Sequence, residues 1–279
     1  MFLEPITEAR INTITSEQHG IAHIHSVASK PNSSVFATGS FGMVSLWDGH
    51  TGQLIRTCEL DENIGEIWAV QFSPDGKTLA TGADNGNILI NDSDTGRLLN
   101  IIKTNESLHS LTYSPDGKTL VSVGKNGTIH FWDVNTYKIK NTINEFTFHA
   151  FSIAYTPDSN SIVTGNISKI SFWDAKTGKL QKTIPGLIGN VVALAISPDG
   201  KILASADSFH VRLWDVDTGR LIGSLNDKKN NVNSLAFSLD GKILATGSKY
   251  TTIGLWKINY DEKDFNEHSC LNYQDILMK

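Results

Sequence analysis

The stretch SPDGKILASADSFHVRLWDVDTG, residues 197–219, contains the pattern that decides the fold. It begins with the turn Ser197–Lys201, continues through small residues and a short apolar strand to Trp214-Asp215, and ends in a second turn. The dipeptide recurs roughly every 41 to 44 residues, and such a fixed period indicates an array of repeated units. The six copies are Trp47-Asp48, Asn91-Asp92, Trp132-Asp133, Trp173-Asp174, Trp214-Asp215 and Trp256-Lys257.

Both turns of the unit have a chemical basis. The first recurs as Ser73–Lys77 and Ser114–Lys118, with weaker forms in the other repeats. Proline presets φ, aspartate accepts hydrogen bonds from its own backbone, and glycine tolerates positive φ. The second turn ends in a glycine such as Gly178 or Gly219. We therefore predict positive φ at both of these glycines.

Each unit contains four short apolar segments separated by turns, which is typical of an all-β protein. The small residues Leu203–Ala206 occupy an interior strand and would let a neighbouring sheet approach closely. At this period the pattern predicts four-stranded blades of a β-propeller. No 11-residue stretch shows convincing helical periodicity, although residues 273–278 could form a short helix. We expect one all-β propeller of six blades over residues 1–258, followed by a polar C-terminal tail over residues 259–279.

The registered turns and dipeptides resemble the WD-repeat family over about residues 9–258. Two features of that family are missing: the Gly-His pair near the start of each repeat, and the aspartate in the turn between the second and third strands. The resemblance therefore implies that its buried Asp-His-Ser-Trp hydrogen-bond network does not form as usual, and each buried indole N–H needs another acceptor. The Gly-His pair is replaced, as by Glu62-Asn63, Gly186-Leu187 and Asp227-Lys228, and the turn aspartate by Asn85, Asn126 or Tyr250.

A closed ring has to protect its first and last strands, because unpaired edges promote aggregation. Residues 9–14 resemble the outer-strand segment 54–58, but no blade precedes them. The sixth unit ends at Ile258 without a clear fourth strand. We predict that residues 9–14 supply the outer strand of the last blade as an N-terminal clasp; the alternative is a frayed tail.

Composition argues against several functions. The net charge is −5 and no basic block is present, so we expect no direct binding of nucleic acid. Cys58 and Cys270 form neither a disulfide framework nor a metal-binding spacing, which is typical of an intracellular protein. We find no signal peptide and no apolar run long enough for a membrane span. The expected location is cytoplasmic, nuclear or both.

No phosphate-binding glycine loop, nucleophile elbow or zinc signature is present. We therefore predict no catalytic residue, no metal and no cofactor, and a non-catalytic scaffold that binds other proteins. The nine histidines leave one alternative open: an enzyme or a metal- or ligand-binding propeller that uses a histidine-rich channel mouth.

The candidate binding site is the ring of residues that begin the inner strands. In a propeller these residues encircle the axis at one face, which we call the mouth. Aromatic side chains are enriched in binding hot spots, so this ring is the predicted protein-binding surface. A competing interpretation is that Trp68 and Phe151 fill gaps between blades. The candidates are His25, Trp68, His109, Phe151 and Asn233, with His23, Glu66 and His149 just outside them; Val192 holds the remaining inner-strand position.

A closer resemblance is carried by Ile67–Gly86 and Ser152–Gly165. These stretches are similar to the WD-repeat scaffold subunits shared by the superkiller complex and the polymerase-II-associated elongation complex, which have seven blades. The resemblance implies a role in RNA decay or transcription elongation. It also implies a monomeric propeller within a hetero-complex, bound to peptide segments or helical-repeat subunits.

Overall fold

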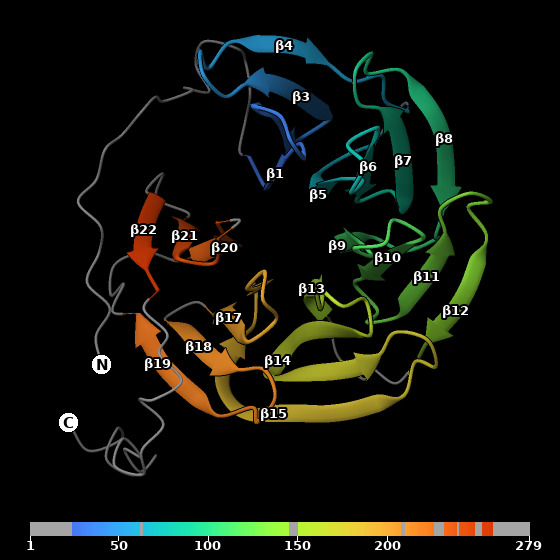
Figure 1. Cartoon of the computed structure of the whole chain (residues 1–279). Helices are drawn as coiled ribbons and strands as arrows, with labels where there is room; N and C mark the ends of the chain where they lie inside the picture. Colours follow the sequence, from blue (N-terminus) through green and yellow to red (C-terminus); the bar gives the residue numbers. More distant parts are fainter. Residues whose placement is uncertain are drawn as a thin grey trace.

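The computed structural model describes residues 24–61, 64–144, 150–207, 210–225, 232–238, 240–248 and 253–258. Their strands form six antiparallel sheets arranged as blades around a central axis (Figure 1). Strands make up nearly half of the chain, and the described ranges contain no helix, hence none long and apolar enough to cross a membrane. The all-β, six-bladed prediction is confirmed.

The first three blades each have four strands, ordered from the axis outward. In the first, β1 (Ser26–Ser29) is innermost, and β2 (Val35–Ser40), β3 (Met43–Asp48) and β4 (Leu54–Thr57) follow. The second contains β5 (Ile67–Phe72), β6 (Thr78–Ala83), β7 (Asn87–Asp92) and β8 (Leu98–Lys103). The third contains β9 (Leu108–Tyr113), β10 (Thr119–Gly124), β11 (Ile129–Asp133) and β12 (Ile139–Ile143).

The last three blades differ in how their strands are divided. The fourth contains β13 (Ala150–Tyr155), β14 (Ser161–Asp174) and β15 (Leu180–Asn190). The fifth contains β16 (Ala193–Ile196), β17 (Ile202–Ala206), β18 (Val211–Asp215) and β19 (Leu221–Leu225). The sixth contains β20 (Val232–Phe237), β21 (Ile243–Ser248) and β22 (Ile253–Lys257).

β14 occupies two of the four strand positions of its blade. Its first part pairs with β13 and its second part with β15. Ser168, between the two parts, has φ of 60°, and the indole of Trp173 donates to the hydroxyl of Thr164 across the bend (3.0 Å). β14 is therefore a hairpin, and the fourth blade keeps the four-stranded plan.

Neighbouring blades pack through small residues on the second strand, as the sequence predicted. Ile67 and Val70 of β5 pack against Gly39 of β2, where an added Cβ would lie 2.6 Å from Ile67 Cγ2. Apolar clusters of this kind join the consecutive blades from the first to the sixth. The core of the protein is thus a series of contacts between blades.

The junction between the sixth and first blades differs. Among the described residues, no apolar cluster joins β20 to β1. Val27 of β1 is 59% exposed, whereas Val70 at the same position of β5 is 4% exposed. The predicted clasp, residues 9–14, lies outside the described residues, as do residues 259–279. The clasp and the boundary at residue 258 therefore stay predictions.

The tryptophans of the repeats find a replacement acceptor one strand inward. Five indole N–H groups each donate to a serine or threonine hydroxyl. In the second blade Asn91 replaces tryptophan and donates to the carbonyls of Glu59 and Gly96, which leaves the buried hydroxyl of Thr81 without a partner. The five pairs are Trp47–Thr38 (2.9 Å), Trp132–Ser122 (2.9 Å), Trp173–Thr164 (3.0 Å), Trp214–Ser205 (2.8 Å) and Trp256–Thr246 (3.2 Å).

Two blades bury a carboxylate that is paired with a basic side chain. His130 Nε2 lies 3.2 Å from Glu106 Oε1, and the Glu106 side chain is only 8% exposed. Asp207 is paired with Arg212, and its side chain is 0% exposed. Because an isolated charge is costly to bury, each pair depends on its partner.

Aspartates accept hydrogen bonds in both repeat turns. The hydroxyl of Ser73 donates to Asp75 (2.6 Å), and the hydroxyl and amide of Thr95 donate to Asp92 (both 2.7 Å). These bonds stabilise the charged carboxylates and hold the pKa of Asp75 and Asp92 below the ordinary value. The pKa of the turn carboxylate is also lowered at Asp48, Asp116, Asp133, Asp158, Asp174 and Asp240.

We expect acid to destabilise the fold through these turns. A lowered pKa in the folded state stabilises the protein above the unfolded pKa, and this contribution is lost as the pH falls. The urea midpoint of unfolding should therefore decrease progressively below about pH 4. Asparagine at Asp48, Asp92, Asp133 and Asp174 keeps an acceptor without a titrating group, so that variant should show a shallower decrease. Equal midpoints at pH 7 and pH 3 would contradict the prediction.

Candidate functional site

The mouth carries a continuous row of aromatic rings across the first four blades. His25 lies just before β1, Trp68 in β5, His109 in β9 and Phe151 in β13, and these strands surround the axis in Figure 1. The ring centroids are 4.5 Å apart for His25 and Trp68, 6.1 Å for Trp68 and His109, and 5.7 Å for His109 and Phe151. We call these four residues the aromatic row.

Local backbone geometry explains why these side chains share one place. Ile67 and Ala69, on either side of Trp68, pair with consecutive residues of β6, so Trp68 is the extra residue of a β-bulge. His109 and Phe151 are skipped in the same way in β9 and β13. A bulge re-aims one side chain relative to its strand and is common next to functional sites. In three blades, therefore, a bulge at the equivalent position of the inner strand changes the direction of an aromatic side chain.

The row is partly exposed, which bears on the competing interpretation that its rings fill gaps between blades. Ile67 and Ala150, the residues before Trp68 and Phe151, are 0% exposed and belong to the apolar clusters. Trp68 and Phe151 remain partly exposed and belong to none of these clusters. They touch neighbouring blades through the row and still present surface to solvent.

Polar groups fix the row on one side. Glu66 Oε2 lies 2.6 Å from His25 Nε2, which links the first two blades. The indole N–H of Trp68 donates to Asp84 Oδ1 (3.0 Å), and the hydroxyl of Ser107 donates to the same oxygen (2.7 Å). Asp84 is exposed and joins the second blade to the third. Since Trp68 is held at its polar edge, its ring has a fixed orientation.

Asp84 was not among the residues predicted for this site. The sequence pattern drew attention to Asn85, which replaces the turn aspartate of the family. The acidic residue one position earlier is the one that contacts the mouth, because the Asp84 amide bonds to the Glu66 carbonyl (2.9 Å) and anchors the turn beside β5. The only feature of the sequence that could have identified Asp84 is its position directly before Asn85, in the turn that the family pattern had already singled out.

The remaining predicted residues have different outcomes. Asn233 is the extra residue of a bulge in β20, but it is exposed and has no contact with the row among the described residues. Val192 is partly buried beside β16. His23 and His149 lie outside the described residues. The structure thus brings together His25, Glu66, Trp68, His109 and Phe151.

The histidine-rich alternative has limited geometric support. In the described ranges, no three His, Cys, Asp or Glu side chains are placed to hold a metal ion. His25 and His109 both contact Trp68, which lies between them in the row. A joint site would therefore need the indole to move away from Asp84.

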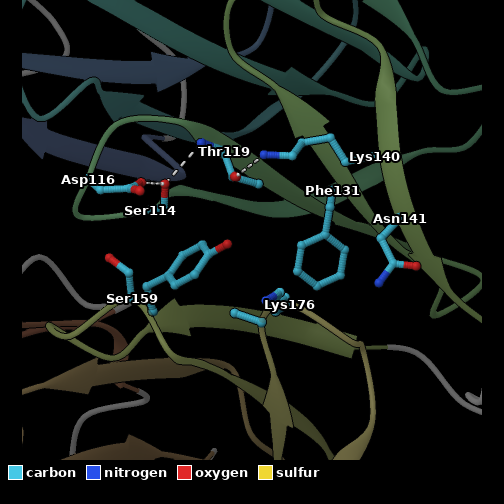
Figure 2. A pocket seen from close by; sticks show the side chains of 10 residues that line it. Ser114, Asp116, Thr119, Phe131, Lys140, Asn141, Ser159 and Lys176 are labelled. Carbon is cyan, nitrogen blue, oxygen red and sulfur yellow. Dashed lines mark hydrogen bonds between the residues drawn. The ribbon is translucent and has the colours of Figure 1, made fainter.

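A pocket of about 300 Å³ lies between the third and fourth blades at the opposite face (Figure 2). The hydroxyl of Ser114 donates to Asp116 (2.6 Å) and the Lys140 ammonium donates to the hydroxyl of Thr119 (3.2 Å). Dashed lines mark both bonds in Figure 2. Asp116 also accepts from the Lys118 amide (3.0 Å). These polar groups are already hydrogen-bonded to the turn and to the adjacent strand, so they are not left to bind a ligand. The mouth is therefore the better candidate site.

Comparisons with known proteins find WD repeats in this chain. The family model described as WD domain, G-beta repeat matches residues 96–133, 178–215 and 219–257. A model of the anaphase-promoting complex subunit 4 WD40 domain matches residues 46–108. The chain is also similar to a curated Arabidopsis thaliana protein, cell division cycle 20.1, a cofactor of the APC complex, at 31% identity over 72 residues. That match covers 26% of this chain and 16% of the relative.

Proposed function

The chain belongs to the WD-repeat β-propeller family, and we propose that it is a non-catalytic scaffold that binds other proteins at its mouth. Propellers of this family generally serve as interaction platforms. The aromatic row is the observation that carries the proposal. Partly exposed aromatic rings at the centre of a face are the residue types that dominate binding energy in protein interfaces.

The scaffold presents these rings in a fixed arrangement. Bulges in β5, β9 and β13 aim Trp68, His109 and Phe151, and Asp84 holds the Trp68 edge. A preorganised surface loses less conformational entropy when it binds. We therefore expect the mouth to bind an extended peptide segment or one element of a helical-repeat subunit.

The proposed setting is a multiprotein complex in the cytoplasm, the nucleus or both. The resemblance to scaffold subunits of RNA-decay and elongation complexes supports such a role. The similarity to a protein named as a cofactor of the APC complex supports the same general role through a different assembly. In each setting the chain would act as one propeller among different subunits.

Affinity capture with the double variant Trp68→Ala/His109→Ala tests the proposal. Loss of two central rings should weaken capture of the proteins retained by the wild-type chain by about tenfold or more, since central anchors contribute about 2 kcal/mol or more each. Recovery is measured by quantitative mass spectrometry after circular dichroism has verified the fold. Lys138→Ala, in the exposed turn before β12, is the control. A folded double variant that recovers the same proteins equally well would overturn the proposal.

A further inference from the structure

We propose that the aromatic row receives a positively charged side chain, an arginine or lysine of a partner peptide, over the ring of Trp68. This inference rests on the proposed binding function of the mouth and specifies the chemistry of the partner. It depends on three features of the described residues: the exposure of one indole, its fixed orientation, and the carboxylates beside it.

Trp68 differs from every other tryptophan of the chain. The other five are between 0% and 8% exposed, and four of them, Trp132, Trp173, Trp214 and Trp256, belong to the apolar clusters between blades. Trp68 is partly exposed, and its N–H is bonded to Asp84, so the edge of the ring is fixed. The faces of aromatic rings attract cations, and indole does so most strongly. The indole lies between the imidazoles of His25 and His109, and its exposed part, oriented by the contact with Asp84, is the surface offered to a cation.

The charge around Trp68 favours the same ligand. Asp84 accepts two hydrogen bonds from neutral donors, Trp68 and Ser107, and forms no ion pair with a described residue. Its negative charge is therefore not neutralised by these contacts. Glu66, the other carboxylate of the mouth, already lies 2.6 Å from His25 Nε2, so Asp84 is the carboxylate that is left for a ligand. Lys125 is the lysine of the neighbouring turn, where its amide donates to the Ser107 carbonyl (2.8 Å).

The geometry suits an organic cation better than a metal ion or an anion. A calcium-like ion needs six or more oxygen ligands, and the described residues contain no three-residue acidic or histidine group placed for a metal. An anion would be repelled by Glu66 and Asp84. A guanidinium group is planar, stacks on aromatic rings and donates to a carboxylate, and an ammonium group can use the same two contacts.

The test uses four peptides of the form Gly-Ser-Gly-X-Gly-Ser-Gly, where X is arginine, lysine, citrulline or glutamate. The protein is labelled with ¹⁵N-tryptophan, and the indole signal of Trp68 is assigned with Trp68→Phe. We expect the arginine and lysine peptides to shift this signal alone among the six indoles. Citrulline has the shape of arginine without its charge, so it should bind about fivefold more weakly or worse, and the glutamate peptide should cause no shift.

Asp84→Asn isolates the charge. Asparagine retains a side-chain oxygen that can accept from Trp68 and Ser107, so the mouth should keep its structure while the arginine peptide binds about fivefold more weakly. Asp116→Asn makes the same charge change in a turn at the opposite face and should leave peptide binding unchanged. Equal binding of the arginine and citrulline peptides, or unchanged binding by Asp84→Asn, would overturn the inference.

Affinity capture separates this inference from the proposed function. If Asp84→Asn captures the cellular partners as well as the wild type does, while Trp68→Ala/His109→Ala loses them, the mouth binds proteins without a cation and the inference is wrong. If the folded double variant captures them equally well, the proposed function is wrong, and the inference about a partner is wrong with it. Parallel losses in both variants support both.

Discussion

Replacing Asp207 with alanine is expected to lower the free energy of unfolding by about 3–5 kcal/mol, because it leaves the mostly buried Arg212 without its partner. The Arg212 side chain is 14% exposed and contacts the carboxylate of Asp207, which is 0% exposed. His210 Nδ1 lies 3.6 Å from the same carboxylate, so the change affects two groups. Urea unfolding at neutral pH, followed by circular dichroism, measures the effect.

Asp217→Ala is the matched control. It removes the same charge from an exposed turn of the same blade, and exposed substitutions usually change stability by less than about 0.5 kcal/mol. Arg212→Met in the Asp207→Ala background should recover part of the loss, since replacing both partners removes the unpaired charge. If Asp207→Ala unfolds at the same midpoint as Asp217→Ala, the buried pair does not stabilise the fold.

Replacing Gly178 or Gly219 with valine is expected to cost about 1–3 kcal/mol of stability through backbone strain. The predicted positive φ is confirmed, at 71° for Gly178 and 69° for Gly219. Gly178 should be the more sensitive, because its added Cβ would lie 3.1 Å from Asn141 Nδ2 and Ile143 Cγ1. At Gly219 the nearest atom, Ile184 Cγ1, is 3.4 Å away.

Gly42→Val separates strain from crowding. Gly42 has φ of 61°, and nothing lies within 4 Å of an added Cβ, so only the backbone penalty applies there. Thermal midpoints should therefore decrease in the order Gly42, Gly219, Gly178. Wild-type midpoints for both Gly178→Val and Gly219→Val would show that positive φ is not needed in this turn.

The site itself was only partly predictable. The sequence identified Trp68, His109 and Phe151 because each occupies the same step before a turn, and the structure brings them into contact. The bulges that re-aim them depend on pairing with the second strand, and no residue type marks them in advance. The contact between Asp84 and Ser107 joins residues 23 positions apart in different blades, so it could not be inferred from spacing.

For the missing hydrogen-bond network, too, the sequence predicted only part of what the structure shows. The sequence predicted that each buried tryptophan needs a new acceptor, but it did not identify the hydroxyl on the adjacent strand. Trp132 finds Ser122 because the register of β10 and β11 brings them together. Glu106 finds His130 because the loop before β9 packs against β11. Neither pairing follows from composition alone.

The sequence by itself determined the repeat, its turns and the number of blades, because these depend on interactions between residues a few positions apart. Ser73 and Asp75, for instance, form the same bond as Ser114 and Asp116. Only the tertiary structure decided which side chains meet at the mouth and which charges are buried. Those contacts cross from one blade to the next, and their distances depend on how far each blade rotates about the axis, which no short segment encodes.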